Sequence, residues 1–113
     1  MQDRAFVNAF CAGFPGAGVS QPFGPEHDCW TVGGTLFAII GQMGAGVSLK
    51  TDHVDTARLL IETGRAIRAP YLHASWVCIP FGRVADEELR ERIATSYALI
   101  RAGLPKRQQA ALG

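Results

Sequence analysis

Apolar side chains recur at three- and four-residue steps in three parts of the chain, which is the periodicity of a helix with one buried face. These segments are residues 3–14, 51–63 and 86–104. Asp3 stands at the start of the first, and Thr51 or Asp52 at the start of the second, and all three are residue types that cap helix starts. The pattern predicts three helices, each of which packs through one apolar face on a larger layer.

Short runs of β-branched and aromatic residues predict strands between and after these helices. Residues 29–32 and 35–40 flank Gly33 and Gly34, whose tolerance of positive φ angles suits a two-residue hairpin turn. Further strands are expected at residues 19–23, 47–50 and 76–79. The piece at 19–23 is expected at a sheet edge, because Pro22 has no N–H for a central ladder.

The order of these elements defines the expected fold class. Helices with one apolar stripe and an antiparallel meander combine into a two-layer α+β sandwich, with the helices packed on one face of the sheet. Residues 1–106 are expected to form a single domain, and residues 107–113 a frayed carboxy-terminal tail. Residues 67–72, with Pro70 among them, fit neither a helix nor a strand clearly.

Composition narrows the class of protein. The 113 residues are 48% hydrophobic and 19% charged, with a formal net charge of +1, which excludes an intrinsically disordered chain. No apolar run approaches the roughly 18 residues that a membrane span needs. A dedicated nucleic-acid-binding domain usually carries a basic excess, and this chain carries almost none.

The cysteines bear on the cellular compartment. Cys11, Cys29 and Cys78 are an odd number at wide spacings, without a C-x-x-C pair. Small secreted domains use even sets of cysteines as staples, so we expect three free thiols and a reducing cytoplasm. The amino terminus lacks the basic and apolar regions of a signal peptide.

An ordered set of short segments resembles the MmcQ/YjbR family of small bacterial proteins. The set consists of residues 14–17, 22–25, 32–38, 47–50, Trp76, 86–89 and 96–97. The resemblance implies a CyaY-like (frataxin-like) sandwich with the order α-β-β-β-β-α-β-α, and a DNA-binding role through a double-wing surface. The chain departs from the family at Thr35 and in residues 71–76, where family members often carry lysine.

Six residues are candidates for nucleic-acid or anion binding. They are Lys50, Arg58, Arg65, Arg68, His73 and Trp76. Lys50 ends a strand just before a capped helix start, where a phosphate could bind, although a solvated strand-end lysine is the simpler interpretation. Trp76 opens an apolar strand, so the alternative to base stacking is an anchor in the core or at its rim. About three or four phosphates would be neutralised, with a salt slope near −3 for duplex DNA.

The sequence gives little support for a metal site or a catalytic site. His27 and Cys29 could face the same side of an extended segment, but zinc needs four ligands and no second pair exists at a suitable spacing. No nucleophile–base constellation is recognisable either.

We therefore expect no cofactor, no metal and no enzyme activity. The sequence favours a non-enzymatic domain that binds DNA weakly and without sequence preference. The alternative is a protein-interaction or small-ligand module that uses the sheet face, away from membranes, as a monomer or weak dimer.

Overall fold

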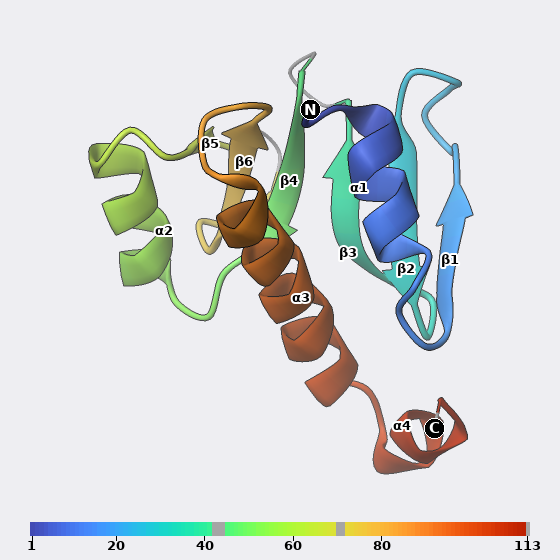
Figure 1. The fold of residues 1–113 in the computed structure, drawn as a ribbon. Coiled ribbons are helices and arrows are strands. Elements are labelled where there is room, and N and C mark those ends of the chain that lie inside the picture. Colours follow the sequence, from blue (N-terminus) through green and yellow to red (C-terminus); the bar gives the residue numbers. More distant parts are fainter. Residues whose placement is uncertain (42–44, 70–71, 113) are drawn as a thin grey trace.

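One antiparallel sheet organises the molecule. The computed structural model describes residues 1–41, 45–69 and 72–112, and within them six strands are arranged in the order β1-β2-β3-β4-β6-β5 (Figure 1). The strands are β1 (Ala17–Ser20), β2 (Asp28–Val32), β3 (Thr35–Ile40), β4 (Gly46–Lys50), β5 (Ile67–Arg68) and β6 (Trp76–Pro80). This is the α+β class that the periodicity and the resemblance predicted.

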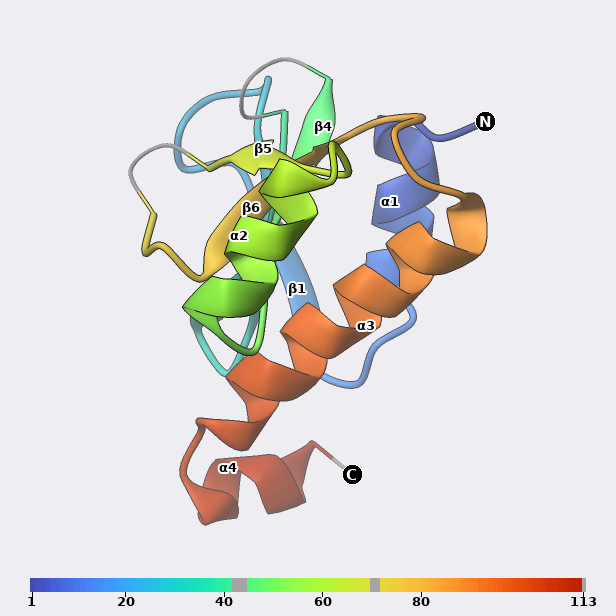
Figure 2. The same ribbon diagram turned by 90° about the vertical axis from the view of Figure 1, so that its left-hand side faces the viewer.

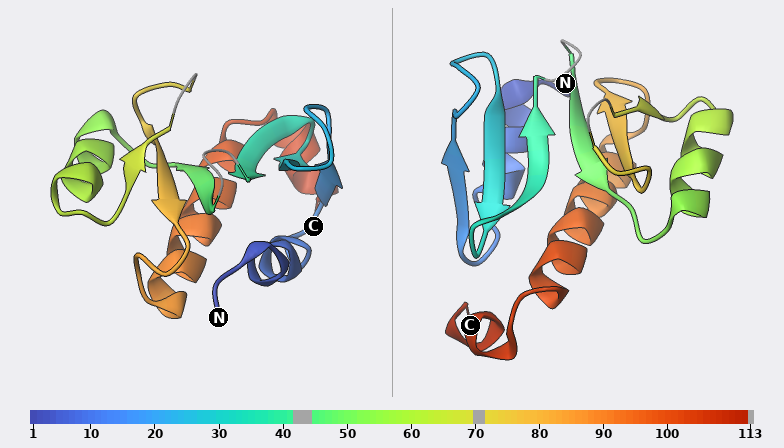
Figure 3. Two further views of the ribbon diagram at one scale, coloured as in Figure 1. Left: turned by 90° about the horizontal axis from the view of Figure 1, so that it is seen from above. Right: turned by 180° about the vertical axis from the view of Figure 1, so that it is seen from behind.

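The helices of the described residues are α1 (Arg4–Cys11), α2 (Val54–Glu62), α3 (Asp86–Ala102) and α4 (Lys106–Ala111). Helices α1 and α3 lie on the same face of the sheet, α1 against β2 and β3 and α3 mainly against β3 and β4 (Figures 1 and 3). Helix α2 packs beside β5 and β6, at the end of the sheet opposite β1 (Figure 2). No helix in the described parts of the chain is long and apolar enough to cross a membrane.

The predicted hairpin is confirmed between β2 and β3. Gly33 and Gly34 both have positive φ angles, 57° and 78°, as the tight two-residue turn requires. The pairing then runs to Asp28 opposite Ile40, with a register shift after Trp30. The strand expected at residues 19–23 begins earlier, as β1, and ends at Ser20, before the proline.

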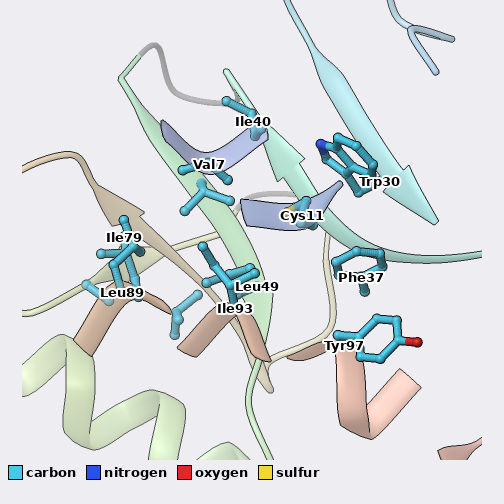
Figure 4. Close-up of a cluster of buried hydrophobic side chains, with 14 of the residues drawn as sticks. Val7, Cys11, Trp30, Phe37, Ile40, Leu49, Ile79, Leu89, Ile93 and Tyr97 are labelled. Carbon is cyan, nitrogen blue, oxygen red and sulfur yellow. The ribbon is translucent and has the colours of Figure 1, made fainter. Parts of the chain in front are cut away.

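The main core lies between the sheet and the two helices that cover it (Figure 4). Val7 and Cys11 of α1 pack there with strand residues such as Phe37 and Leu49, all at most 1% exposed. The alternation of a strand places every second side chain in this layer. Figure 4 shows Ile93 and Tyr97 of α3 entering the same cluster from the helix side.

The residues at the middle of the opposite sheet face are buried. A row of four directly paired residues crosses β2, β3, β4 and β6, and consists of Cys29, Ile39, Ser48 and Cys78. Each is at most 4% exposed. The middle of this face is therefore not an open binding surface, although no helix among the described residues covers it (Figure 3).

The helix boundaries differ from the expected ones. Helix α1 is capped by Asp3, whose carboxylate accepts from the Phe6 N–H, but it ends at Cys11 rather than near residue 14. Phe14 then stacks on Tyr97 of α3, with ring centroids 4.4 Å apart.

The residue that caps α2 also differs from the expected one. It is His53, whose Nδ1 accepts from the Asp55 N–H at 3.0 Å, and not Thr51 or Asp52. The hydroxyl of Thr51 instead donates to the Ser75 carbonyl.

Two segments are more ordered than the sequence predicted. The ambiguous stretch 67–72 begins with β5, which pairs with β6, while Pro70 lies outside the described residues. The tail expected to fray forms α4 instead. Gln109 donates to the Leu104 carbonyl at 2.8 Å, and Leu112 packs against the core beside Gly16. The helix is held by contacts of one glutamine and one leucine, and two such residues do not produce the apolar periodicity by which a helix is predicted from sequence.

Candidate functional site

A cavity of about 360 Å³ opens between α2, β5 and the segment that leads into β6. Figure 2 shows these elements side by side at the end of the sheet. The lining residues are Val54, Arg58, Ile61, Glu62, Arg68, Ala69, Leu72, His73, Ala74 and Trp76. Four of the six residues predicted to bind an anion are among them.

Helix periodicity explains the α2 wall. Val54, Arg58, Ile61 and Glu62 are spaced at steps of four, three and one, so they lie on one face of the helix. Ala57 and Leu60, which are offset from them, are buried in the core and fix the rotation of the helix. The wall thus combines two apolar side chains with one cation and one carboxylate.

The two arginines of the cavity are open to solvent. Arg58 lies 3.8 Å from the Asp55 carboxylate, but both side chains are well exposed, and such pairs stabilise by at most about 1 kcal/mol. Arg68 lies on the two-residue strand β5 and makes no ion pair with any described residue. Both guanidinium groups are therefore available to an anionic ligand.

His73 and Lys50 are held by one serine. Nδ1 of His73 accepts from the Ser75 N–H at 3.1 Å and lies 2.9 Å from the Ser75 hydroxyl. The ammonium of Lys50 donates to the same hydroxyl at 2.9 Å. Because Nδ1 acts as an acceptor, the hydrogen of the neutral imidazole lies on Nε2. Lys50 adjoins the cavity without lining it.

Trp76 occupies the rim rather than the main core. It is half-buried, pairs with Lys50 across β4 and β6, and donates its backbone N–H to the His73 carbonyl at 2.9 Å. The next residue, Val77, belongs to the core cluster, so alternation directs the indole of Trp76 to the other face of the strand. Trp76 is therefore an aromatic wall of the cavity.

Arg65 lies outside the cavity. Its guanidinium is 3.5 Å from the Glu88 carboxylate at the start of α3. The sequence thus predicted four lining residues and a neighbour, but it missed the apolar wall of Val54, Ile61 and Leu72 and the carboxylate of Glu62. The step pattern in α2 signals part of that wall, but only the packing of α2 shows that it faces a cavity.

The metal site considered at His27 and Cys29 can be compared with its surroundings in the described part of the fold. Among the described residues, no three histidine, cysteine or acidic side chains gather as metal ligands would. Asp28, which lies between them, is buried and is instead bound by Arg4, Asn8 and Gln21. Hydrogen bonding to the Arg4 guanidinium holds the pKa of the Asp28 carboxyl well below its usual range.

The thiols are poorly suited to nucleophilic chemistry. No disulfide involves any of the three cysteines, and all three are buried. Burial raises the pKa of Cys11 to about 12 and also raises the pKa of Cys78. Burial, followed by the charge of Asp28, raises the pKa of Cys29. Each sulfur is therefore held as a neutral thiol, which is the unreactive form.

Comparison with known proteins identifies the family. A model of the YjbR family matches residues 12–99, so the chain belongs to the YjbR family. The crystal structure of Deinococcus radiodurans protein DR2400, which carries the domain DUF419, is similar to this fold. The TM-score is 0.84 and the sequences are 26% identical, over 100% of this chain and 89% of that chain. The comparison with curated proteins gives no match.

Proposed function

We propose that this YjbR-family chain is a non-enzymatic binding domain that binds nucleic acid weakly and without sequence preference at the cavity beside α2. One observation carries the proposal: Arg58, Arg68, His73 and Trp76 line the same cavity. Guanidinium groups bind phosphate, and an aromatic ring offers a stacking surface to a base. Neither contact reads the identity of a base, so the binding is tolerant of sequence.

The side chains near the cavity support binding more than catalysis. Ser75 is the hydroxyl closest in arrangement to a nucleophile, since Lys50 and His73 both contact it. However, Ser75 is only 4% exposed, and a nucleophile must be able to reach a substrate atom. Ser75 is therefore poorly placed to act as a nucleophile. Its hydrogen bonds to Lys50 and His73, which we call the Ser75 bracket, instead stabilise the cavity wall.

The arrangement of the cations makes the interaction weaker than the sequence predicted. Arg65, which faces Glu88, and Lys50, which is bound to Ser75, do not line the cavity, so Arg58 and Arg68 are the cations that a ligand meets there. Two neutralised phosphates give a duplex salt slope of about −1.8 instead of about −3. A rise from about 50 to 200 mM salt then weakens binding by about twelvefold.

A small anionic ligand is the second candidate for the same cavity. The volume falls within the roughly 300–1,000 Å³ of small-molecule sites, and Val54, Ile61 and Leu72 provide apolar walls. The sheet face, which the sequence suggested for such a ligand, is a poorer site because its central row of residues is buried. The cavity at the sheet end is therefore the place to test both functions.

A titration of labelled mixed-sequence DNA, with variants, tests the proposal. The double variant Arg58→Ala with Arg68→Ala removes both cavity cations, and we expect it to abolish measurable binding at low salt. Arg107→Ala is the matched control, because Arg107 is an exposed arginine on α4, away from the cavity. Equal loss in the control, or binding that is insensitive to the double substitution, contradicts the proposed site. Binding that depends strongly on sequence contradicts the proposed mode.

A further inference from the structure

We infer that the cavity beside α2 takes one unpaired nucleotide of a single strand, with its base against Trp76 and its phosphate on Arg58 and Arg68. The chain would then prefer single-stranded nucleic acid to a duplex. This inference rests on the proposed function and specifies the ligand of the same site. It is carried by the shape of the site, by its aromatic and apolar walls, and by the distribution of charge around it.

The shape of the site favours an unpaired nucleotide. A duplex is convex and keeps its bases stacked and paired inside, so at a concave site it can bring only backbone phosphates to the rim. An unpaired base can turn out of the strand and enter a pocket. A cavity of about 360 Å³ is large enough for a planar ligand of this size, and a phosphate contact alone would leave its apolar walls unused.

The walls suit the two surfaces of a base. Trp76 is the aromatic residue among the described lining residues, and stacking on an indole is open to every base because each has a π face. Val54, Ile61 and Leu72 exclude water from the remainder of the ring. Ile61 is a large apolar side chain that is 39% exposed, so this wall offers apolar surface to a ligand.

The charged side chains of the cavity determine which end of it the phosphate occupies and which end the base occupies. Arg58 and Arg68 attract the phosphate, whereas Glu62, on the same face of α2 as Arg58, repels it. A carboxylate accepts hydrogen bonds from the amino groups that adenine, cytosine and guanine carry. Glu62 therefore belongs with the base, and the arginines with the phosphate. The Nε2–H of His73 is a further donor that no described residue engages.

Three probes distinguish the occupants: a labelled single-stranded oligonucleotide, the duplex of the same sequence, and free adenosine monophosphate. We expect the single strand to bind about 5- to 150-fold more tightly than the duplex, which is the contribution of stacking one base on an aromatic side chain. The free mononucleotide should bind more weakly than the strand, because it lacks the neighbouring phosphates. Its salt slope should be smaller for the same reason.

Variants of Trp76 test the stacking contact. Trp76→Leu keeps an apolar side chain and should remove the preference for the single strand. Trp76→Phe keeps an aromatic ring and should retain much of it. Arg65→Ala, which removes a nearby arginine outside the cavity, should leave the preference unchanged. The ratio of single-strand to duplex affinity in the unmodified protein decides the matter even if Trp76→Leu fails to fold.

The outcomes separate the two proposals. Equal affinity for strand and duplex, unchanged in Trp76→Phe, overturns the single-strand inference and leaves nucleic-acid binding at the arginines intact. Binding of the mononucleotide as tightly as the strand overturns the strand as the occupant and favours the small-ligand function. Failure of all three probes to bind at low salt overturns both proposals.

Discussion

The ammonium of Lys50 lies 2.9 Å from the Ser75 hydroxyl and donates a hydrogen bond to it. This contact joins the end of β4 to the residue just before β6, next to the strand pair of Lys50 and Trp76. The same hydroxyl contacts His73, and the Ser75 carbonyl accepts from Thr51 at 2.8 Å through the backbone and at 2.6 Å through the hydroxyl. Ser75 thus fixes the segment that carries the cavity residues Leu72, His73, Ala74 and Trp76.

The substitution Ser75→Ala tests this bracket. It removes the hydroxyl that Lys50 and His73 share, and we expect it to lower the free energy of unfolding by about 0.5–1.5 kcal/mol, the net contribution of a typical hydrogen bond. Urea denaturation measures the change. Ser20→Ala, at an exposed strand position, is the matched control and should be neutral within about 0.5 kcal/mol. A neutral Ser75→Ala would show that the bracket does not stabilise the fold.

Asp28 predicts a pH dependence of stability. Its pKa is lowered in the folded state by Arg4 and by the amides of Asn8 and Gln21. A lowered pKa stabilises the fold above the ordinary carboxyl pKa of about 3.9, and this stabilisation is lost as the pH falls below that value. At pH 7, Asp28→Asn should cost about 1–3 kcal/mol, because it breaks a buried charged hydrogen bond.

Denaturation of both proteins over a range of pH checks that expectation. The difference in unfolding free energy between the natural protein and Asp28→Asn should be constant from pH 7 to about pH 5 and should shrink at lower pH. Asp3→Asn, at the exposed cap of α1, should show a much smaller difference. A difference that grows as the pH falls would contradict the assigned pKa direction.

Two strand glycines differ in the space around them. A Cβ at Gly46 would lie 2.8 Å from the Ile79 carbonyl oxygen and 3.0 Å from the Pro80 Cα, both of which are backbone atoms. A Cβ at Gly18 would meet nothing within 4 Å. Gly46→Ala should therefore destabilise by about 1–3 kcal/mol through overpacking. Gly18→Ala, measured by the same thermal denaturation, should be neutral or slightly stabilising, and a similar loss at both positions would contradict the packing argument.

Leu112 tests the docking of α4. Its half-buried side chain packs beside Gly16 and Val32, and we expect Leu112→Ala to lower the stability by about 1 kcal/mol through lost apolar burial. Leu59→Ala is the control, since Leu59 is 59% exposed on α2. Amide hydrogen exchange should also become faster in α4 of Leu112→Ala. Unchanged exchange would mean that Leu112 does not hold the helix.

The three thiols predict a distinctive alkylation pattern. Because Cys11, Cys29 and Cys78 are buried and form no disulfide, a thiol reagent should modify none of them rapidly in the native protein at pH 8. It should modify all three once the chain is unfolded without reductant. Mass spectrometry counts the additions. A pair that stays protected after unfolding would reveal a disulfide and contradict the structure.

Local sequence determined the elements and the class of fold. Apolar periodicity and capping residues depend on neighbours within one or two turns, so the three long helices, the Gly33-Gly34 hairpin and the two-layer arrangement could be predicted. The segments too short for periodicity were missed. Strand β5 has two residues and exists because it pairs with β6, and α4 docks on the core through Leu112, which lies beside the distant Gly16.

The site was decided by tertiary packing. Arg58, Arg65 and Arg68 look equivalent in the sequence, yet Arg65 is directed to Glu88 of α3 whereas the other two line the cavity. Lys50 is likewise held by Ser75, which lies 25 residues away. Which partner a long charged side chain takes depends on what the fold brings within about 4 Å of it. The sequence determined which residues could bind an anion, and only the docking of α2 on β5 and β6 determined which of them surround one space.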